Sequence, residues 1–197
     1  MKLTTLILVC AISLTLAIEQ PKYEVIQNLG VNMEIRKYAP SKWVTTQVDV
    51  RASDVKNSNM FNDLFNYISG ANSDNQKIDM TAPVVTSYVS KNNSVINKDS
   101  EVTASMSFYI PSKFKDNTPK PSSNNVFIRE LPEFVTAVVR FGGYANLDDY
   151  MKNRDALVEA LGSDAKSYDI INMVTAGYSA PYTILDRKNE VWIPKIS

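Results

Sequence analysis

The sequence predicts an α+β protein in which a barrel-like antiparallel sheet carries two amphipathic helices on its outside. Three observations lead to this fold class. Most segments alternate apolar and polar residues with the period of two that is typical of half-buried strands. Two stretches instead repeat their apolar residues with the period of an α-helix. The order of strands, helix and strands occurs twice, which predicts a duplicated unit whose two copies pair into one sheet.

The chain begins with three predicted strands. Residues 23–27 and 33–38 alternate apolar and polar side chains, and residues 28–30 between them are typical of a tight turn. Residues 43–50 follow Pro40 and are rich in β-branched side chains, so we expect the third strand there.

An amphipathic helix is expected next, and Gly70 supplies its C-terminal stop. Its apolar residues recur at helical spacing: Met60, Phe61, Leu64, Phe65 and Ile68. Extended segments are expected at 77–80, 83–89 and 101–110. The proline-bearing, polar stretch 112–125 is expected to be a loop.

The second half of the sequence predicts the same order of strands, helix and strands. Strands are predicted at 126–130 and 134–141, and Asn146 with Asp149 three residues later is typical of a helix cap. One face of the predicted helix, which Gly162 ends, carries Leu147, Tyr150, Met151, Leu157, Val158 and Leu161. Further extended segments are expected at 170–174, 182–185 and 190–194.

Short matching words support an internal repeat. In the same order in both halves, the pairs are Ile35-Arg36 with Ile128-Arg129, Trp43-Val44-Thr45 with Phe134-Val135-Thr136, and Ala82-Pro83 with Ala180-Pro181. Each half then holds a hairpin, a helix and an Ala-Pro turn into another strand. We therefore expect a single duplicated domain.

The composition excludes several classes of function. The chain of 197 residues has no His and only one Cys, so it lacks Ser-His and Cys-His catalytic pairs and His-based metal sites. Its 21 basic and 21 acidic residues balance, so no long-range field attracts DNA or RNA. No glycine-rich phosphate loop is present either. We expect a protein that is not an enzyme and has no nucleic-acid partner.

The N-terminus resembles a secretory signal. Lys2 precedes an apolar run, and Thr15-Leu16-Ala17 is a small-residue cleavage site, so residues 1–17 are predicted to be a cleaved signal peptide that contains Cys10. A buried N-terminal helix or a membrane anchor is the other interpretation, but the run is shorter than the ~20 apolar residues that span a bilayer. No second hydrophobic span follows. The mature protein is then one secreted domain, residues 18–197.

One glycosylation sequon is present, Asn92-Asn93-Ser94. It lies in a polar stretch, residues 90–100, that is flanked by apolar runs. The sequence therefore predicts a glycosylated Asn92 on a hairpin loop, with an unused sequon as the alternative.

Several longer words point to a known family. They are Arg36-Lys37-Tyr38-Ala39-Pro40-Ser41-Lys42-Trp43-Val44, Lys77-Ile78-Asp79-Met80-Thr81-Ala82-Pro83-Val84, Phe141-Gly142-Gly143-Tyr144, Ala176-Gly177-Tyr178 and Asn189-Glu190-Val191-Trp192. In this order they resemble the SOUL family of haem-binding proteins over about residues 23–196. The resemblance implies a distorted antiparallel β-barrel made of two βαββ-type repeats with two flanking helices. It also implies non-catalytic binding of haem or free porphyrin in a shallow apolar groove beside the first helix.

The resemblance also suggests site residues. The groove positions of the first helix hold Phe61, Leu64 and Phe65, which can stack on a porphyrin face, although the same stripe could simply pack on the sheet. Positions that are basic in some relatives correspond to Ser58 and Thr183, and Lys56 or Arg187 could substitute for them. A His proposed as iron ligand in one relative aligns with Lys37. The candidates for an axial iron ligand are Tyr182, Tyr178, Met60, Met80 and Lys37.

Two functions remain open. The first is a secreted haem- or porphyrin-binding protein that holds its ligand mainly by apolar stacking. The alternative is a secreted protein-interaction or small-ligand module that kept the fold and lost haem binding. The sequence indicates no particular protein partner.

Overall fold

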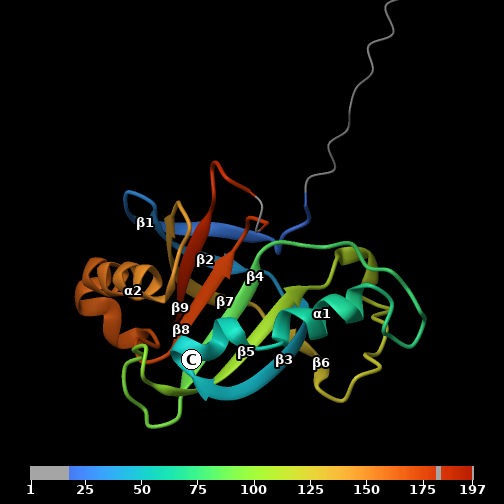
Figure 1. The fold of residues 1–197 in the computed structure, drawn as a ribbon. Coiled ribbons are helices and arrows are strands. Elements are labelled where there is room, and N and C mark those ends of the chain that lie inside the picture. The colour runs from blue at the N-terminus through green and yellow to red at the C-terminus, as the bar shows by residue number, and fades with distance from the viewer. Residues whose placement is uncertain (1–17, 181–182, 197) are drawn as a thin grey trace, which may run out of the picture.

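One antiparallel sheet organises the molecule (Figure 1). The structure is a computed structural model that describes residues 18–180 and 183–196. In this part of the chain the sheet has nine strands: β1 (Tyr23–Gly30), β2 (Met33–Tyr38), β3 (Ser41–Arg51), β4 (Val84–Ser90), β5 (Glu101–Tyr109), β6 (Val126–Leu131), β7 (Phe134–Phe141), β8 (Met173–Gly177) and β9 (Asn189–Pro194). Their spatial order is β1-β2-β7-β9-β8-β4-β5-β3-β6, with antiparallel neighbours throughout.

The strand order confirms the duplication. In the first repeat, β5 lies between β3 and β4, and in the second repeat β9 lies in the same way between β7 and β8. The two repeats meet where β4 pairs with β8. The strand that precedes each repeat crosses to the other one, because β2 pairs with β7 and β6 pairs with β3. Each repeat therefore receives one strand from the other repeat. β1 pairs with β2 and forms one edge of the sheet.

The sheet curls into a half-barrel and does not close. Within the described residues its edge strands, β1 and β6, form no ladder with each other. The helices α1 (Met60–Ile68) and α2 (Leu147–Leu161) cover one face, α1 over β3, β5 and β6 and α2 over β7 and β9. Figure 1 shows them at opposite ends of the curled sheet. The expected α+β class, with two repeats and two flanking helices, is confirmed.

Alternation along the strands gives the sheet two differently filled faces. On the outer face, which the helices cover, Val44 and Phe108 pack against Leu64 of α1, and Val191 and Ile193 belong to the cluster that includes α2. The opposite, inner face carries a third cluster of Tyr38, Trp43, Val138, Ala176 and Trp192. Neighbours in sequence such as Trp43 and Val44 thus enter different clusters, as the period of two requires.

Three short 3₁₀ segments that the sequence did not predict complete the fold. They are η1 (Ala52–Asn57), η2 (Ser112–Phe114) and η3 (Gly162–Ser167). In η1, buried Ala52 and Val55 anchor the chain just before α1. The predicted polar hairpin loop is confirmed, because β4 ends at Ser90, β5 begins at Glu101, and Asn92 between them is exposed. No helix in residues 18–180 and 183–196 is long and apolar enough to cross a bilayer.

The prediction of a turn at residues 28–30 is wrong. β1 continues to Gly30, and the turn lies at Val31 and Asn32. Asn32 adopts a φ of 59°, a left-handed conformation that Asn tolerates better than most residues. The apolar tip, Val31, is exposed because it has left the sheet.

Three of the expected extended segments also differ. Residues 77–80 form no strand, because Ile78 instead closes the end of α1 with its N–H on the Ile68 carbonyl at 2.8 Å. β8 begins only at Met173, since the side chain of Asn172 bonds to Asp169 and to the Ser90 N–H. Residues 183–185 are not a strand either, and Tyr182 lies outside the described residues.

The Ala-Pro match between the halves is wrong as well. Ala82-Pro83 precedes β4, whereas Ala180 follows β8, which ends at Gly177. The two words therefore occupy different places in the two repeats. The evidence for the duplication is therefore the strand order and not the Ala-Pro pairs.

The predicted cap of the second helix is confirmed. The Asn146 Oδ1 accepts the N–H groups of Asp148 at 2.8 Å and Asp149 at 3.2 Å. In return, the Asp149 Oδ2 accepts the N–H of Asn146 at 2.9 Å. This reciprocal arrangement satisfies backbone donors that the first turn of α2 leaves without helical partners.

We therefore expect Asn146→Ala to lower the free energy of unfolding by about 1 kcal/mol, because the cap loses its side-chain acceptor. Asn146→Asp keeps that acceptor and serves as the matched control. Both are measured by urea denaturation of a protein that comprises residues 18–197. Equal stabilities of the two variants would contradict a role for the cap.

Candidate functional site

The first helix presents a pair of aromatic rings on its outer side. Its buried residues, Met60, Leu64, Tyr67 and Ile68, face the sheet. Phe61 and Phe65, one helical turn apart, remain 41% and 48% exposed. Their ring centroids lie 6.1 Å apart with an interplanar angle of 14°, so the rings are nearly parallel. Phe61 also touches the buried Phe108 edge-on at 5.3 Å, which fixes the pair against the sheet.

The predicted stripe on α1 is therefore divided between two roles. Leu64 is fully buried in the cluster with Val44 and Tyr67, so it supports the helix from below. Phe61 and Phe65 offer apolar surface to a ligand. A helical wheel could not separate them, because all these residues fall within one broad apolar face.

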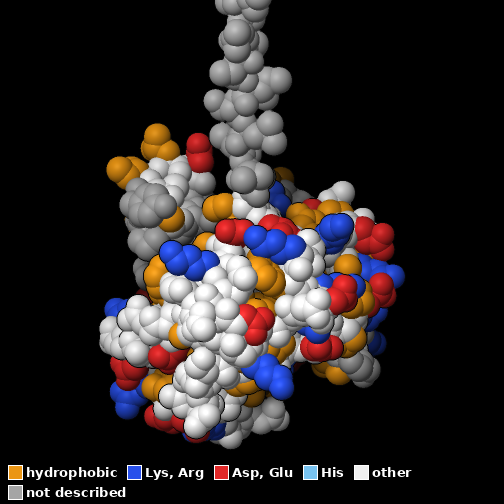
Figure 2. All heavy atoms as spheres, turned by 90° about the vertical axis from the view of Figure 1, so that its right-hand side faces the viewer, with side chains coloured by type: hydrophobic (Ala, Val, Ile, Leu, Met, Phe, Trp, Pro, Cys, Tyr) orange, Lys and Arg blue, Asp and Glu red, His pale blue; other side chains and the backbone are white. Residues whose placement is uncertain are grey.

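The hollow beside the N-terminal end of α1 is polar. It has a volume of about 490 Å³ between β3, η1 and α1, and its charged lining residues are Asp54 and Asp63. Figure 2 shows this side of the molecule, with hydrophobic side chains in separate spots and with basic and acidic groups interleaved. The surface that suits a flat apolar ligand is consequently the Phe61 and Phe65 pair rather than this hollow.

The basic candidates have different surroundings. Lys56 is exposed on η1, shortly before α1, whereas Ser58 donates its hydroxyl to the Val55 carbonyl at 2.6 Å. Arg187 is engaged elsewhere: it lies 4.4 Å over the ring of Tyr144 and donates to the carbonyl of Thr183 at 2.9 Å. Of these candidates, Lys56 is the cation placed nearest to α1 along the chain.

Lys37 is poorly suited to bind iron. It lies on β2, which pairs with β1 and β7, whereas α1 packs on β3, β5 and β6. Its ammonium group is 2.9 Å from Glu133 and 4.0 Å from Glu24. The hydrogen bond to Glu133 raises the pKa of Lys37, and a Lys must lose its proton before it can coordinate a metal.

Two of the other axial candidates are engaged away from the ring pair. Met60 is buried in the core cluster that also contains Leu157 of α2, and the Tyr178 hydroxyl donates to Glu190 on the inner face. Met80 is partly exposed in the segment after α1, and Tyr182 lies outside the described residues. Within the described part of the chain, no three His, Cys, Asp or Glu side chains gather as a metal site. The described residues fit a porphyrin plane better than they fit its iron.

A buried ion pair dominates the inner face. Arg36 on β2 and Glu190 on β9 are both fully buried, and two hydrogen bonds of 3.0 and 3.1 Å join the guanidinium to the carboxylate. Arg36 also donates to the Tyr38 hydroxyl at 3.0 Å and to Glu34 at 2.6 Å. The guanidinium lies 4.2 Å over the ring of Tyr23, which covers it from the other side.

Further donors complete the surroundings of Glu190. The Tyr178 hydroxyl donates to its carboxylate at 2.7 Å and the Trp192 indole N–H at 2.9 Å. Arg140 and Lys188 approach the other oxygen, each at 3.4 Å. A carboxylate removed from water needs this many donors, because an unpaired buried charge is strongly destabilising.

These contacts set the protonation states of the network. Burial alone would raise the pKa of Glu190, but the hydrogen bonds and charge of Arg36, with the donors Trp192 and Tyr178, hold it below the ordinary value of 4.5. Burial would likewise lower the pKa of Arg36, and Glu190 reverses the effect. Burial and the neighbouring Glu190 raise the pKa of Tyr178, so its phenol keeps its proton. A neutral, half-buried Tyr178 that already donates to Glu190 is not available as an iron ligand.

Sequence reasoning missed this network. Its two central charges lie 154 positions apart, so no local spacing connects them. The available signal was a charged residue on the alternating face of each strand: Arg36 lies two residues before Tyr38, and Glu190 two residues before Trp192. Side chains on a strand alternate between its two faces, so Arg36 lies on the same face as Tyr38, and Glu190 on the same face as Trp192.

The described residues form a small α+β domain built on a curled antiparallel sheet in two repeats. Its first helix carries an aromatic pair, and the inner face of its sheet holds a buried ion pair. The SOUL heme-binding protein family model matches residues 18–194. The chain therefore belongs to the SOUL heme-binding protein family.

Individual relatives agree with this membership. The chain is 36% identical to Heme-binding protein 2 of Mus musculus over 180 residues, which is 90% of this chain and 86% of the relative. The same identity and coverage hold for Heme-binding protein 2 of Homo sapiens. Heme-binding protein 1 of Xenopus tropicalis is 30% identical over 84% of this chain and 85% of its own length.

Solved structures share the fold. The C-terminal domain of EcmrR superposes with a TM-score of 0.57 at 12% identity, over 89% of this chain and 98% of that domain. An uncharacterized conserved protein from Listeria innocua gives 0.57 at 10% identity, over 86% and 93%. At such identities the likeness concerns the fold alone.

The pKa of Glu190 predicts a pH-dependent stability. A carboxyl group whose pKa is lowered by folding stabilises the protein above its unfolded pKa and loses that contribution as the pH falls. We expect the free energy of unfolding to decrease below about pH 4.5. Glu190→Gln should reduce that decrease and should lower the stability at pH 7 by about 3–5 kcal/mol, since Arg36 loses its counter-charge.

The matched control is Glu159→Gln, which makes the same change at an exposed position of α2 and should alter the stability by less than about 0.5 kcal/mol. Denaturation with urea between pH 3 and 7 measures all three proteins. An unchanged pH dependence in Glu190→Gln would show that Glu190 is not the titrating group.

Proposed function

We propose that this protein is a secreted, non-catalytic tetrapyrrole-binding protein that holds haem or free porphyrin against Phe61 and Phe65 of α1. One observation carries the proposal: two stacked aromatic rings remain exposed on a helix of a chain that belongs to a heme-binding family. The relatives named heme-binding proteins 1 and 2 support the ligand class.

The geometry suits a flat ligand. The rings are nearly parallel, with centroids 6.1 Å apart, so a flat apolar ligand can continue their stack. Covering them would remove on the order of 200 Å² of apolar surface from water, which corresponds to about 5 kcal/mol before the cost of association. Such a contact gives modest affinity. The exposed Lys56 on η1, five residues before Phe61, is the candidate partner for a propionate.

Stacking rather than coordination follows from the residues themselves. The chain has no His, and the donors tested above are buried, ion-paired or hydrogen-bonded elsewhere, apart from Met80 and from Tyr182, which lies outside the described residues. Binding by apolar contact should be insensitive to the metal in the ring. We therefore propose that metal-free protoporphyrin and haem bind alike.

The alternative function, a secreted module that kept the fold without haem binding, has one specific observation in its favour. The side chain of Ser58, where some relatives carry a basic residue, is neutral and satisfied by the Val55 carbonyl. Thr183 is likewise neutral. A missing anchor for propionates lowers the affinity for tetrapyrroles more than it affects a ligand without carboxylates.

Secretion rests on the sequence and on the extent of the family match. The match begins at residue 18, immediately after the predicted cleavage site at Ala17. We propose that residues 1–17 are removed and that the domain 18–197 is exported. Exposure of Asn92 on the β4–β5 loop leaves its side chain accessible to a glycosyltransferase.

The ligand proposal predicts equal affinities for haemin and metal-free protoporphyrin. Both are titrated into the mature protein and followed by the Soret band and by tryptophan quenching. Dissociation constants within about threefold of each other correspond to less than 1 kcal/mol and support stacking. A low-spin spectrum with haemin alone, together with much weaker binding of the free porphyrin, would contradict it.

Substitution of the ring pair tests its position. Phe61→Asp or Phe65→Asp places a charge under the porphyrin and should weaken binding at least tenfold. Phe127→Asp on β6 is the matched control, because Phe127 is 39% exposed and does not lie on α1. Equal losses in all three variants would place the ligand elsewhere.

Export predicts a defined product. Expression of the full chain in a cell with a secretory pathway should release a protein whose N-terminus is Ile18 and which a peptide-N-glycosidase shortens on a gel. Ser94→Ala should abolish the shift, and Ser94→Thr, which preserves the sequon, should retain it. Retention of the chain inside the cell with an intact Met1 would overturn the localisation.

A further inference from the structure

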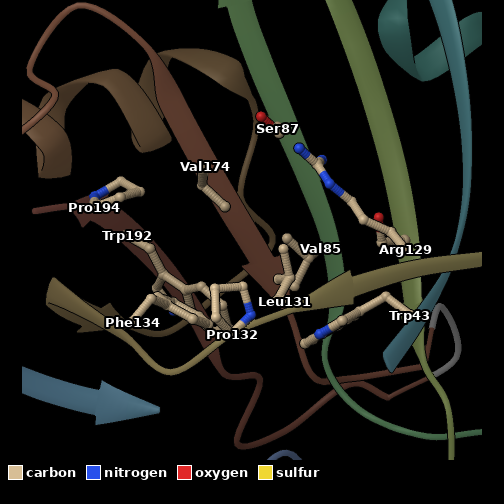
Figure 3. A pocket seen from close by; sticks show the side chains of 11 residues that line it. Trp43, Val85, Ser87, Arg129, Leu131, Pro132, Phe134, Val174, Trp192 and Pro194 are labelled. Atoms are coloured by element: carbon tan, nitrogen blue, oxygen red, sulfur yellow. The ribbon is translucent and has the colours of Figure 1, made fainter. Parts of the chain in front are cut away.

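The inner face of the sheet contains a cavity of about 250 Å³, on the side opposite to α1 and α2 (Figure 3). Seven strands contribute to it. Its lining residues are Trp43, Val85, Ser87, Ser107, Arg129, Leu131, Pro132, Phe134, Val174, Trp192 and Pro194. The aromatic pair on α1 takes no part in it, so the cavity is separate from the surface proposed above for tetrapyrroles.

One wall of the cavity is aromatic and has no free hydrogen-bonding group. Its indoles are Trp43 and Trp192, the only two Trp residues of the chain. The indole N–H of Trp43 is used by Ser41 at 2.9 Å, and that of Trp192 by Glu190 at 2.9 Å. What these side chains offer to the cavity is therefore apolar ring surface.

This wall is also held in place. The ring of Tyr38 stacks on Phe134 at 5.1 Å with an interplanar angle of 7°, and it contacts Trp192 at 4.9 Å. The Tyr38 hydroxyl and Glu190 belong to the buried network around Arg36. Because these contacts order the rings before a ligand binds, less conformational entropy is lost on binding.

The other end of the cavity is basic. Figure 3 shows the side chain of Arg129 extending from β6 toward Ser87 on β4. Its neighbour Glu130 is paired with Lys42 at 2.8 Å, whereas Arg129 forms no ion pair within the described residues. No Asp or Glu lines the cavity, so an anionic group there would meet one guanidinium and no repelling carboxylate.

We propose that this cavity is a binding site for a small aromatic carboxylate. One or two fused rings lie between Trp192, Phe134 and Val174, and the carboxylate accepts hydrogen bonds from Arg129 and Ser87. The volume supports this size, because a cavity of about 150 Å³ holds benzene and a tetrapyrrole is several times larger. Apolar lining with a few convergent polar groups is the usual make-up of a small-molecule site.

The test uses 2-naphthoate as the probe and the mature protein as the receptor. Isothermal titration calorimetry gives the affinity, and intrinsic fluorescence reports the site directly, since both Trp residues line it. Saturable one-to-one binding with a change in Trp fluorescence is expected. The uncharged naphthalene-2-carboxamide should bind about tenfold more weakly. Absence of binding at millimolar naphthoate, or equal affinity for the amide, would overturn the proposal.

Charge variants test the basic end. Arg129→Ala should weaken naphthoate binding about tenfold, Arg129→Glu should abolish it, and Arg129→Lys should retain part of it. Lys166→Glu, which makes the same charge reversal on exposed η3, is the control and should bind as the wild type does. Because Arg129 is an exposed side chain, these variants should fold. Wild-type affinity in Arg129→Glu would overturn the proposal.

A steric variant tests the apolar end. Val174→Phe fills the space beside Trp192 and should abolish binding, whereas Val95→Phe makes the same change on the exposed β4–β5 loop and should have no effect. Circular dichroism verifies that both fold, and the Arg129 series decides the question if Val174→Phe does not. Undiminished naphthoate binding by a folded Val174→Phe protein would overturn the proposal.

Protoporphyrin titrations separate the two sites. The Arg129 and Val174 variants should bind protoporphyrin as the wild type does, and Phe61→Asp should bind naphthoate as the wild type does. Failure of naphthoate binding alone would leave the tetrapyrrole proposal standing. Loss of both ligands in the cavity variants, with Phe61→Asp unaffected, would make the cavity the tetrapyrrole site and overturn both assignments.

Discussion

The structure depends on the buried ion pair between Arg36 and Glu190. β2 precedes the first repeat and β9 ends the second, and both pair with β7. The guanidinium and carboxylate therefore join the two ends of the duplicated unit across the strand between them. Either charge alone would be strongly destabilising at this depth, whereas the pair, with its surrounding donors, fixes how β2, β7 and β9 lie against each other.

The same network connects the fold to both candidate sites through the alternation of the strands. On β9, Glu190 and Trp192 face inward, while Val191 and Ile193 pack in the outer cluster with α2. Glu190 holds the indole of Trp192, and that indole forms part of the cavity wall. On β3 and β5, the outward-facing Val44 and Phe108 support α1, whose outer side carries the ring pair. One sheet thus separates an exposed aromatic pair on one face from an aromatic-lined cavity on the other.

Local patterns in the sequence were sufficient for most elements, because strands, helices and caps are decided by neighbouring residues. The helix Met60–Ile68 and the Asn146 cap were predicted from spacing alone. Contacts between distant segments were not accessible in this way, as the pairing of Arg36 with Glu190 shows. Nor could periodicity decide that Phe61 and Phe65 are exposed while Leu64 is buried, since that depends on the angle at which α1 meets the sheet. The cavity, made by seven strands, has no local signature at all.

The two repeats place α1 and α2 at equivalent positions, but only α1 exposes aromatic rings on which a ligand could stack. The exposed positions of α2 are Asp148, Lys152, Asp155, Glu159 and Ala160, which offer water no aromatic ring. Its buried Arg154 donates to the Ile96 carbonyl at 2.6 Å and ties α2 to the β4–β5 loop. α1 makes a comparable contact, because the hydroxyl of its buried Tyr67 donates to the Pro119 carbonyl at 2.9 Å. The two repeats have the same strand order and have diverged on their surfaces, so a ligand that stacks on α1 has no equivalent place on α2.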